Sequence, residues 1–146
     1  MQSSIMKKII FLILFSSAFG VGAGEIVQQC NSDNLANECI PKLSEGFNFL
    51  KSYKIDGTAK DRIEYSYVFM KGTQYMINIC TGGAVTDGMV VSILDKDRNK
   101  IASSKINGQF VSAIAYPCNA SGIYYIQYTF DDPSNHCGGS ALGFKR

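Results

Sequence analysis

The sequence predicts a mainly β protein, an antiparallel β-sandwich or barrel preceded by a short helical segment. From Gly46 onward, apolar and polar residues alternate with a period of two in several segments. That period places successive side chains on opposite faces of a strand. The segments are short and are separated by turn residues at regular spacing. Such spacing favours an antiparallel sandwich or barrel over a parallel sheet with helical connections.

The first 24 residues are typical of a secretory signal peptide. Lys7 and Lys8 form a short positive region, residues 9–15 are an apolar run, and residues 16–24 are mostly small. The apolar run is too short to cross about 30 Å of hydrocarbon, which needs about 20 residues. We therefore expect residues 1–24 to be removed. The mature chain is then exported to the periplasm, the cell surface or the extracellular space, without a transmembrane segment.

Removal of the leader changes the charge balance. The whole chain has 14 basic and 12 acidic residues, and two of the lysines lie in the leader. The mature chain therefore has equal numbers of basic and acidic residues. It has no run of Lys or Arg that could neutralise a row of phosphates. We expect no nucleic-acid partner. Residues 25–146 are close to the commonest size of a single domain.

Residues 25–45 are expected to form a helical N-terminal segment. Within residues 32–44, apolar side chains recur every four positions on one helical face, and Ser32 or Asp33 can cap the start. Pro41 lacks an amide hydrogen and clashes with the preceding turn. The helix should therefore kink or restart there.

Residues 46–146 are expected to form the β domain. Alternation predicts strands within 47–55, 63–69, 75–79, 110–116 and 123–130. Residues 89–94 are almost continuously apolar, as in a strand that is buried on both faces. Residues 95–100 form a polar turn after that strand. The glycines in residues 137–139 are interpreted as a bend or a close approach of two backbones.

Five cysteines follow the leader: Cys30, Cys39, Cys80, Cys118 and Cys137. Export favours disulfides, and the odd count leaves at least one thiol unpaired or paired with another chain. Cys118 is predicted to pair with Cys137, because the two flank the strand at 123–130. Either Cys30 or Cys39 is predicted to pair with Cys80 and so pin the helical segment to the sheet. Metal binding is the competing use, but the chain has no CxxC pair and one histidine. We expect no metal and no cofactor.

The one histidine, His136, precedes Cys137 and suggests a thiol nucleophile with its base. Adjacent residues on a strand point to opposite faces, so adjacency does not support that pair. No Gly-x-Ser-x-Gly motif occurs that would indicate a serine hydrolase. We therefore predict no catalytic residues.

Asp95, Asp97 and Asn99 match the first three ligand positions of a calcium loop. Ile106 occupies the position of the closing bidentate glutamate. A hairpin turn explains the same residues, because Asp and Asn form local hydrogen bonds in turns. Weak calcium binding by this loop stays as the alternative.

Tyrosines are the other notable feature, and Tyr124 and Tyr128 are the candidates for stacking on a ligand. Tyr124 and Tyr125 point to opposite faces of a strand, so at most one of them shares a face with Tyr128. Packing within the core is the competing and favoured interpretation.

Three segments, residues 67–75, 91–102 and 121–126, share a pattern of strands and turns. Together they resemble the bacterial β-sandwich domains of the pre-peptidase C-terminal type, which are found beside secreted peptidases. The resemblance extends from Tyr65 to Phe130. It implies a jelly-roll-like sandwich that serves as an accessory or binding module without catalysis of its own. The helical N-terminal segment and the five cysteines depart from that pattern.

The sequence thus predicts an exported, non-catalytic module that binds a glycan, a surface polymer or a partner protein. One alternative is a small secreted hydrolase or thiol enzyme that uses Cys137 or Cys118 with His136 as base. A second alternative is a structural component of the cell envelope.

Overall fold

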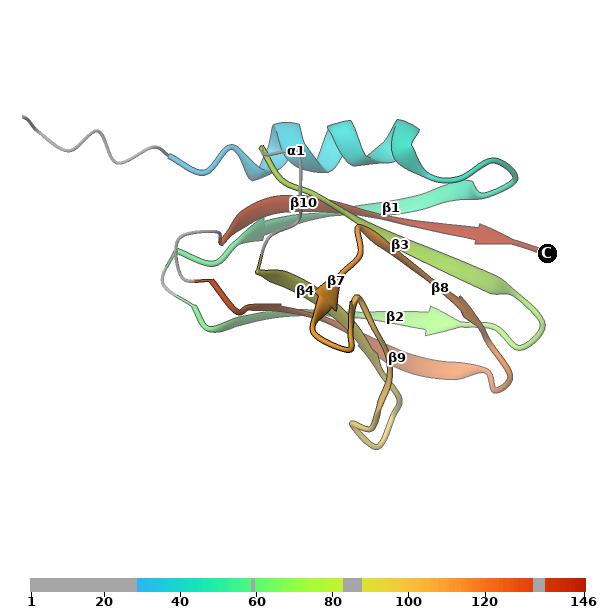
Figure 1. Cartoon of the computed structure of the whole chain (residues 1–146). Coiled ribbons are helices and arrows are strands. Elements are labelled where there is room, and N and C mark those ends of the chain that lie inside the picture. The colour runs from blue at the N-terminus through green and yellow to red at the C-terminus, as the bar shows by residue number, and fades with distance from the viewer. Residues whose placement is uncertain (1–28, 59, 83–87, 133–135) are drawn as a thin grey trace, which may run out of the picture.

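The computed structural model describes residues 29–58, 60–82, 88–132 and 136–146, so the predicted signal peptide lies outside the described residues. Within these ranges the chain forms two antiparallel sheets that face each other, with one helix on the outside of one sheet (Figure 1). The predicted fold class, mainly β with a short N-terminal helical segment, is confirmed.

The first sheet contains, in spatial order, β1 (Asn48–Asp56), β10 (Cys137–Lys145), β3 (Gln74–Cys80) and β8 (Ala113–Pro117). The second sheet contains β2 (Arg62–Phe69), β9 (Gly122–Phe130), β4 (Met89–Leu94) and β5 (Lys100–Ser103). A separate hairpin pairs β6 (Lys105–Ile106) with β7 (Gln109–Phe110). Its turn residues Asn107 and Gly108 have φ of 50° and 77°, as a tight hairpin turn of the primed type requires.

The helical segment is α1 (Ser32–Cys39), followed by a 3₁₀ turn, η1 (Ile40–Lys42). The change of helix type coincides with Pro41, as predicted. The capping residue differs from the prediction. The side chain of Asn31, rather than Ser32 or Asp33, accepts a hydrogen bond from the Asn34 amide at 3.3 Å. Asn is among the best residues at this position.

The core lies between the two sheets and is rich in aromatic rings. The alternation predicted for β2 and β3 is confirmed, since Phe69, Tyr75 and Ile77 all point inward and are buried. The Phe69 ring stacks on Tyr75 of the first sheet at 3.9 Å and on Tyr124 of its own sheet at 4.9 Å, measured between centroids. All six residues of β4 are buried, as its continuous apolar sequence predicts.

Two predicted strands differ in detail. The register of β1 shifts between Phe49 and Lys51, so that Leu50 packs against the core and Phe49 is 45% exposed. Strict alternation along the strand predicted within 47–55 places Phe49 on the buried face with Tyr53, and the bulge overturns that expectation. A bulge inserts one residue and reverses the alternation on one side of it. The strand predicted at 110–116 is divided between β7 and β8.

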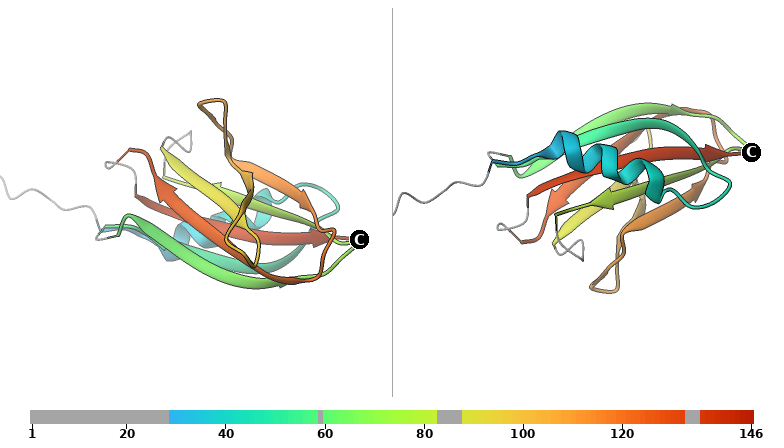
Figure 2. Two further views of the ribbon diagram at one scale, coloured as in Figure 1. Left: turned by 90° about the horizontal axis from the view of Figure 1, so that it is seen from below. Right: turned by 90° about the horizontal axis from the view of Figure 1, so that it is seen from above.

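The sequence did not predict β10 as a strand, because glycines and small residues lower strand propensity. It nevertheless lies between β1 and β3 and pairs with both. Of the two interpretations of its glycines, a bend or a close approach of two backbones, the structure shows the close approach. A Cβ atom at Gly139 would lie 2.0 Å from the Ala36 backbone nitrogen in α1. Seen from above, α1 runs across this sheet (Figure 2, right).

Asn78 and a disulfide join the helix to the sheet. The Asn78 side chain donates to the Cys39 carbonyl at 2.8 Å and accepts from the Ala141 amide at 2.9 Å. Cys39 also forms a disulfide with Cys80 of β3. This pair is one of the two alternatives predicted for Cys80.

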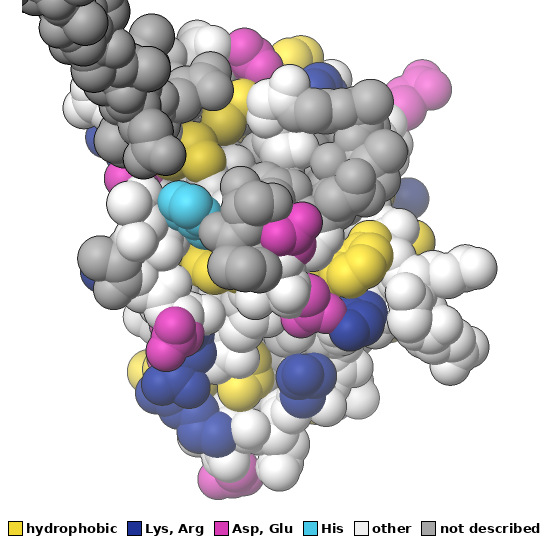
Figure 3. Space-filling view, turned by 60° about the vertical axis from the view of Figure 1, so that its left-hand side comes forward, with side chains coloured by type: hydrophobic (Ala, Val, Ile, Leu, Met, Phe, Trp, Pro, Cys, Tyr) yellow, Lys and Arg dark blue, Asp and Glu magenta, His cyan; other side chains and the backbone are white. Residues whose placement is uncertain are grey.

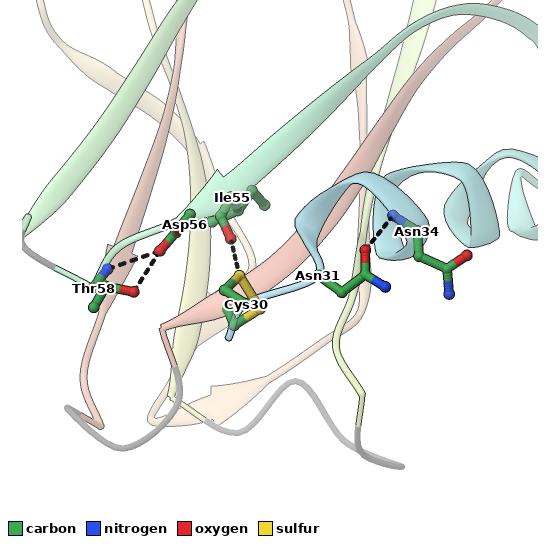
Figure 4. The surroundings of a disulfide bond; sticks show 7 residues. Cys30, Asn31, Asn34, Ile55, Asp56 and Thr58 are labelled. Carbon is green, nitrogen blue, oxygen red and sulfur yellow. Dashed lines mark hydrogen bonds between the residues drawn. A yellow bond between two sulfur atoms is a disulfide. The ribbon is translucent and has the colours of Figure 1, made fainter. Parts of the chain in front are cut away.

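A second disulfide joins Cys30 to Cys137, so the predicted Cys118–Cys137 pair is wrong. Figure 4 shows Cys30 beside the end of β1, near the Ile55 carbonyl. Cys137 pairs with Asp56 there, whereas Cys118 follows Pro117, which pairs with Gln74 at the other end of the sheet. The two ends of a nine-residue strand are about 26 Å apart. Cys118 is a free, buried thiol.

We expect Gly139→Ala to destabilise the fold by about 1–3 kcal/mol, because the added methyl group meets backbone atoms of α1 that cannot move aside. Urea unfolding measures the effect. Gly122→Ala in β9 is the control, since a Cβ there meets no atom within 4 Å. Equal stability of the two variants would show that α1 does not pack on Gly139.

The disulfides predict a definite thiol count. A thiol-reactive dye should label no cysteine in the native protein, one cysteine after denaturation without reductant, and all five after reduction. Labelling of Cys118 before denaturation would contradict its burial. Two or more labelled thiols in the denatured, unreduced chain would contradict the pairing.

Candidate functional site

The outward-facing side of the second sheet is the candidate functional site, and we call it the outer face. Strand neighbours on this face are Val68 with Ile123, Ser66 with Tyr125, and Glu64 with Gln127. The residues between them in sequence point inward to the core. The rows lie beside one another across β2 and β9, so together they form one continuous surface.

One end of the outer face is apolar. Val68, Met70 and Ile123 are 54%, 52% and 51% exposed. They line a shallow hollow of about 520 Å³ together with Ser66 and Tyr67. A contiguous group of exposed apolar side chains is a candidate interaction site, whereas single exposed apolar residues need no explanation.

The other end of the outer face is polar and is organised around Arg98. The guanidinium carbon of Arg98 lies 3.7 Å from the centroid of the Tyr125 ring. Arg98 also forms an ion pair with one carboxylate oxygen of Glu64. The other oxygen accepts a hydrogen bond from Gln127 at 3.2 Å. Arg98, Glu64 and Gln127 line a second hollow of about 610 Å³ together with Arg62 and Leu94.

The backbone of Arg98 is in the left-handed conformation, with φ of 68°. This conformation favours Gly or Asn over other residues. The β4–β5 turn holds it, because the Arg98 amide donates to the Asp95 carbonyl at 3.0 Å and the Asp95 amide donates to the Asn99 carbonyl at 2.9 Å. The side chain of Arg98 is thereby directed over the outer face.

The calcium candidates form the same turn. The Asp95 carboxylate accepts hydrogen bonds from the Asn99 amide and from the Asp97 amide, both at 2.9 Å. These hydrogen bonds hold the pKa of Asp95 below its ordinary value, and the bond from the Asn99 backbone contributes most. Asp97 pairs with Lys96. Among the described residues, no group of three His, Cys, Asp or Glu side chains is arranged to hold a metal. The hairpin-turn interpretation accounts for the geometry.

Tyr124 and Tyr128, the predicted stacking residues, are core residues. They are 5% and 0% exposed, so neither ring can stack on a ligand. The Tyr124 hydroxyl donates to the Ala120 carbonyl and the Tyr128 hydroxyl donates to Ser140 Oγ, both at 2.7 Å. Burial raises the pKa of both hydroxyls above the ordinary value. Tyr125, which was not predicted as a ligand-stacking residue, is placed on the outer face by the same alternation.

Among the described residues, neither Cys118 nor Cys137 has a free thiol next to the His136 side chain. Cys137 is held in a disulfide with Cys30. Cys118 is 4% exposed and lies at the opposite end of the first sheet from His136, which precedes β10. The two cysteines of the predicted thiol mechanism are therefore unavailable to His136.

On the face that Figure 3 shows, which includes the histidine (cyan), basic and acidic side chains lie close to one another rather than in separate areas. Among the described residues, no helix is both long and apolar enough to cross a bilayer.

No family model matches the chain, and no curated protein matches it. Among solved structures, the chain is similar to the crystal structure of Aeromonas hydrophila PliG, a periplasmic lysozyme inhibitor of g-type lysozyme. The sequence identity is 18%, the match covers 68% of this chain and 87% of that chain, and the TM-score is 0.43. A similarity of this degree does not establish a shared activity.

The burial of Tyr128 predicts an alkaline loss of stability. Above pH 10 the unfolded chain releases the tyrosine proton while the folded state retains it, so the free energy of unfolding falls by about 1.4 kcal/mol per pH unit for each such group. Tyr128→Phe should reduce this slope and should cost about 1 kcal/mol at neutral pH, because Ser140 loses its partner.

Urea unfolding between pH 8 and pH 11 measures both effects. Tyr125→Phe is the matched control, since it makes the same substitution on the outward side of the same strand. An equal change of slope in the two variants would contradict the assignment of Tyr128 to the core.

Proposed function

We propose that the mature chain is an exported, non-catalytic module that binds a partner protein through its outer face. The observation that carries this proposal is the exposed apolar cluster of Val68, Met70 and Ile123 next to the Arg98–Tyr125 pair. Exposed aliphatic side chains gain free energy when a partner removes them from water, at about 25 cal/mol per Å².

The residue types favour a protein over a glycan. Tyrosine, methionine and arginine are enriched at protein interfaces, and tyrosine and arginine dominate the residues on which affinity depends. A sugar ring needs an open aromatic face. On the outer face the Tyr125 ring is covered by the Arg98 guanidinium, and the exposed apolar residues are aliphatic.

Export is supported by the cysteines as well as by the predicted leader. Two disulfides join four of the five cysteines. Structural disulfides form and persist in oxidising compartments outside the cytoplasm. The absence of catalysis is supported by the separation of His136 from the buried thiol of Cys118.

A structural component of the cell envelope is the second candidate. The apolar cluster includes Val68 on β2, which is an edge strand of the second sheet. Edge strands pair with other chains where nothing blocks them. The two candidates differ in the partner, because a structural component would bind further copies of itself.

Capture experiments test the proposal. The tagged mature chain is incubated with the envelope fraction of the producing cells, cross-linked, and the captured proteins are quantified by mass spectrometry. Val68→Ser with Ile123→Ser should reduce capture of the partner at least tenfold, about 1.4 kcal/mol. Phe49→Ser with Ile106→Ser is the control, because these residues are also exposed but lie outside the second sheet.

Binding to a glycan array or to isolated cell wall that is unchanged by the outer-face substitutions would contradict the proposal. Concentration-dependent self-association that these substitutions abolish, measured by analytical ultracentrifugation, would favour the structural component instead.

A further inference from the structure

We propose that the partner presents a carboxylate to the polar hollow between Arg62 and Arg98, and that a second, apolar side chain of the same partner packs on Val68 and Ile123 at the other end of the outer face. This inference rests on the proposed function and specifies the chemistry of the partner. It follows from the charges of the hollow, the fixed position of Arg98 and the distance between the two hollows.

The hollow has more positive than negative charge. Arg62, Arg98 and Glu64 all line it. The single carboxylate of Glu64 is shared between Arg98 and Gln127. Within the described part of the chain, Arg62 has no acidic side chain within ion-pairing distance. An incoming carboxylate would therefore supply the missing negative charge, and guanidinium groups bind carboxylates with two parallel hydrogen bonds.

The nearby acidic residues do not supply this charge. Asp95 and Asp97 belong to the same turn as Arg98. The Asp95 carboxylate accepts hydrogen bonds from within the turn on both oxygens. Asp97 pairs with Lys96.

The Arg98 guanidinium is already in position before a partner binds. The left-handed backbone conformation of Arg98 directs the side chain, the Tyr125 ring supports one face of the guanidinium, and Glu64 holds one of its nitrogen atoms. An arginine has five N–H donors, so others remain for a ligand. Because the side chain is restrained, binding costs less conformational entropy than for a free arginine.

The spacing of the two hollows defines the partner further. Val68 and Glu64 lie on the same face of β2, four residues apart. That separation corresponds to about 13 Å along a strand. The carboxylate and the apolar side chain of the partner should therefore be about 13 Å apart, as are residues i and i+4 of an extended segment.

Selection from a library of phage-displayed linear peptides tests the inference, with the mature chain as target. We expect the selected peptides to carry Asp or Glu four residues from an aliphatic or aromatic residue. A synthetic selected peptide should bind at least tenfold more weakly to Arg62→Gln with Arg98→Gln, and binding should weaken as salt increases. Lys42→Gln with Lys54→Gln is the matched control, since these cations lie on the other side of the sandwich.

A second variant, Arg98→Gly, removes the guanidinium while suiting the backbone conformation, so that loss of binding is separable from loss of folding. Circular dichroism verifies the fold of each variant.

The outcomes separate the two proposals. Peptides that depend on Val68 and Ile123 but lack an acidic residue, or bind the Arg62 and Arg98 variants normally, would overturn this inference and leave the protein-binding function standing. Failure to enrich any peptide, or peptides insensitive to both sets of substitutions, would overturn both.

Discussion

The contact between α1 and the glycine-rich side of β10 is the constraint on which the rest of this domain depends. A helix can lie this close to a sheet only where the strand below has almost no side chains, as at Gly139. The backbone groups brought together are satisfied by Asn78, which binds both the helix end and β10. The Cys39–Cys80 disulfide then fixes the arrangement. A small domain with a limited core gains substantial stability from such crosslinks.

That contact also makes the two sides of the sandwich unequal. The outside of the first sheet is covered by α1, so its small residues are buried. The outside of the second sheet keeps aliphatic residues in water next to an arginine in a strained backbone conformation. Both features cost free energy in the isolated protein. Local costs of this kind concentrate where a protein performs its function.

Regular alternation made most of the strands predictable from sequence, as in β2 and β9, because side-chain period alone decides which face is buried. Features that break the period were not predictable. The bulge in β1 exposes Phe49, which strict alternation places on the buried face. The glycines of β10 have low strand propensity, so this strand was not predicted. The candidate site could not be predicted from the sequence, because its residues Arg98 and Glu64 are 34 positions apart. Only the folded sheet shows that the turn after β4 reaches across to β2.

The order of strands has a consequence for biogenesis. β10 comes last among the described elements, yet it occupies an interior position of the first sheet, and its Cys137 bonds to Cys30 across a sequence separation of 107. Neither the first sheet nor this crosslink can form until the C-terminal strand is present. The first sheet therefore depends on contacts between residues far apart in the sequence, and such contacts form more slowly than local ones.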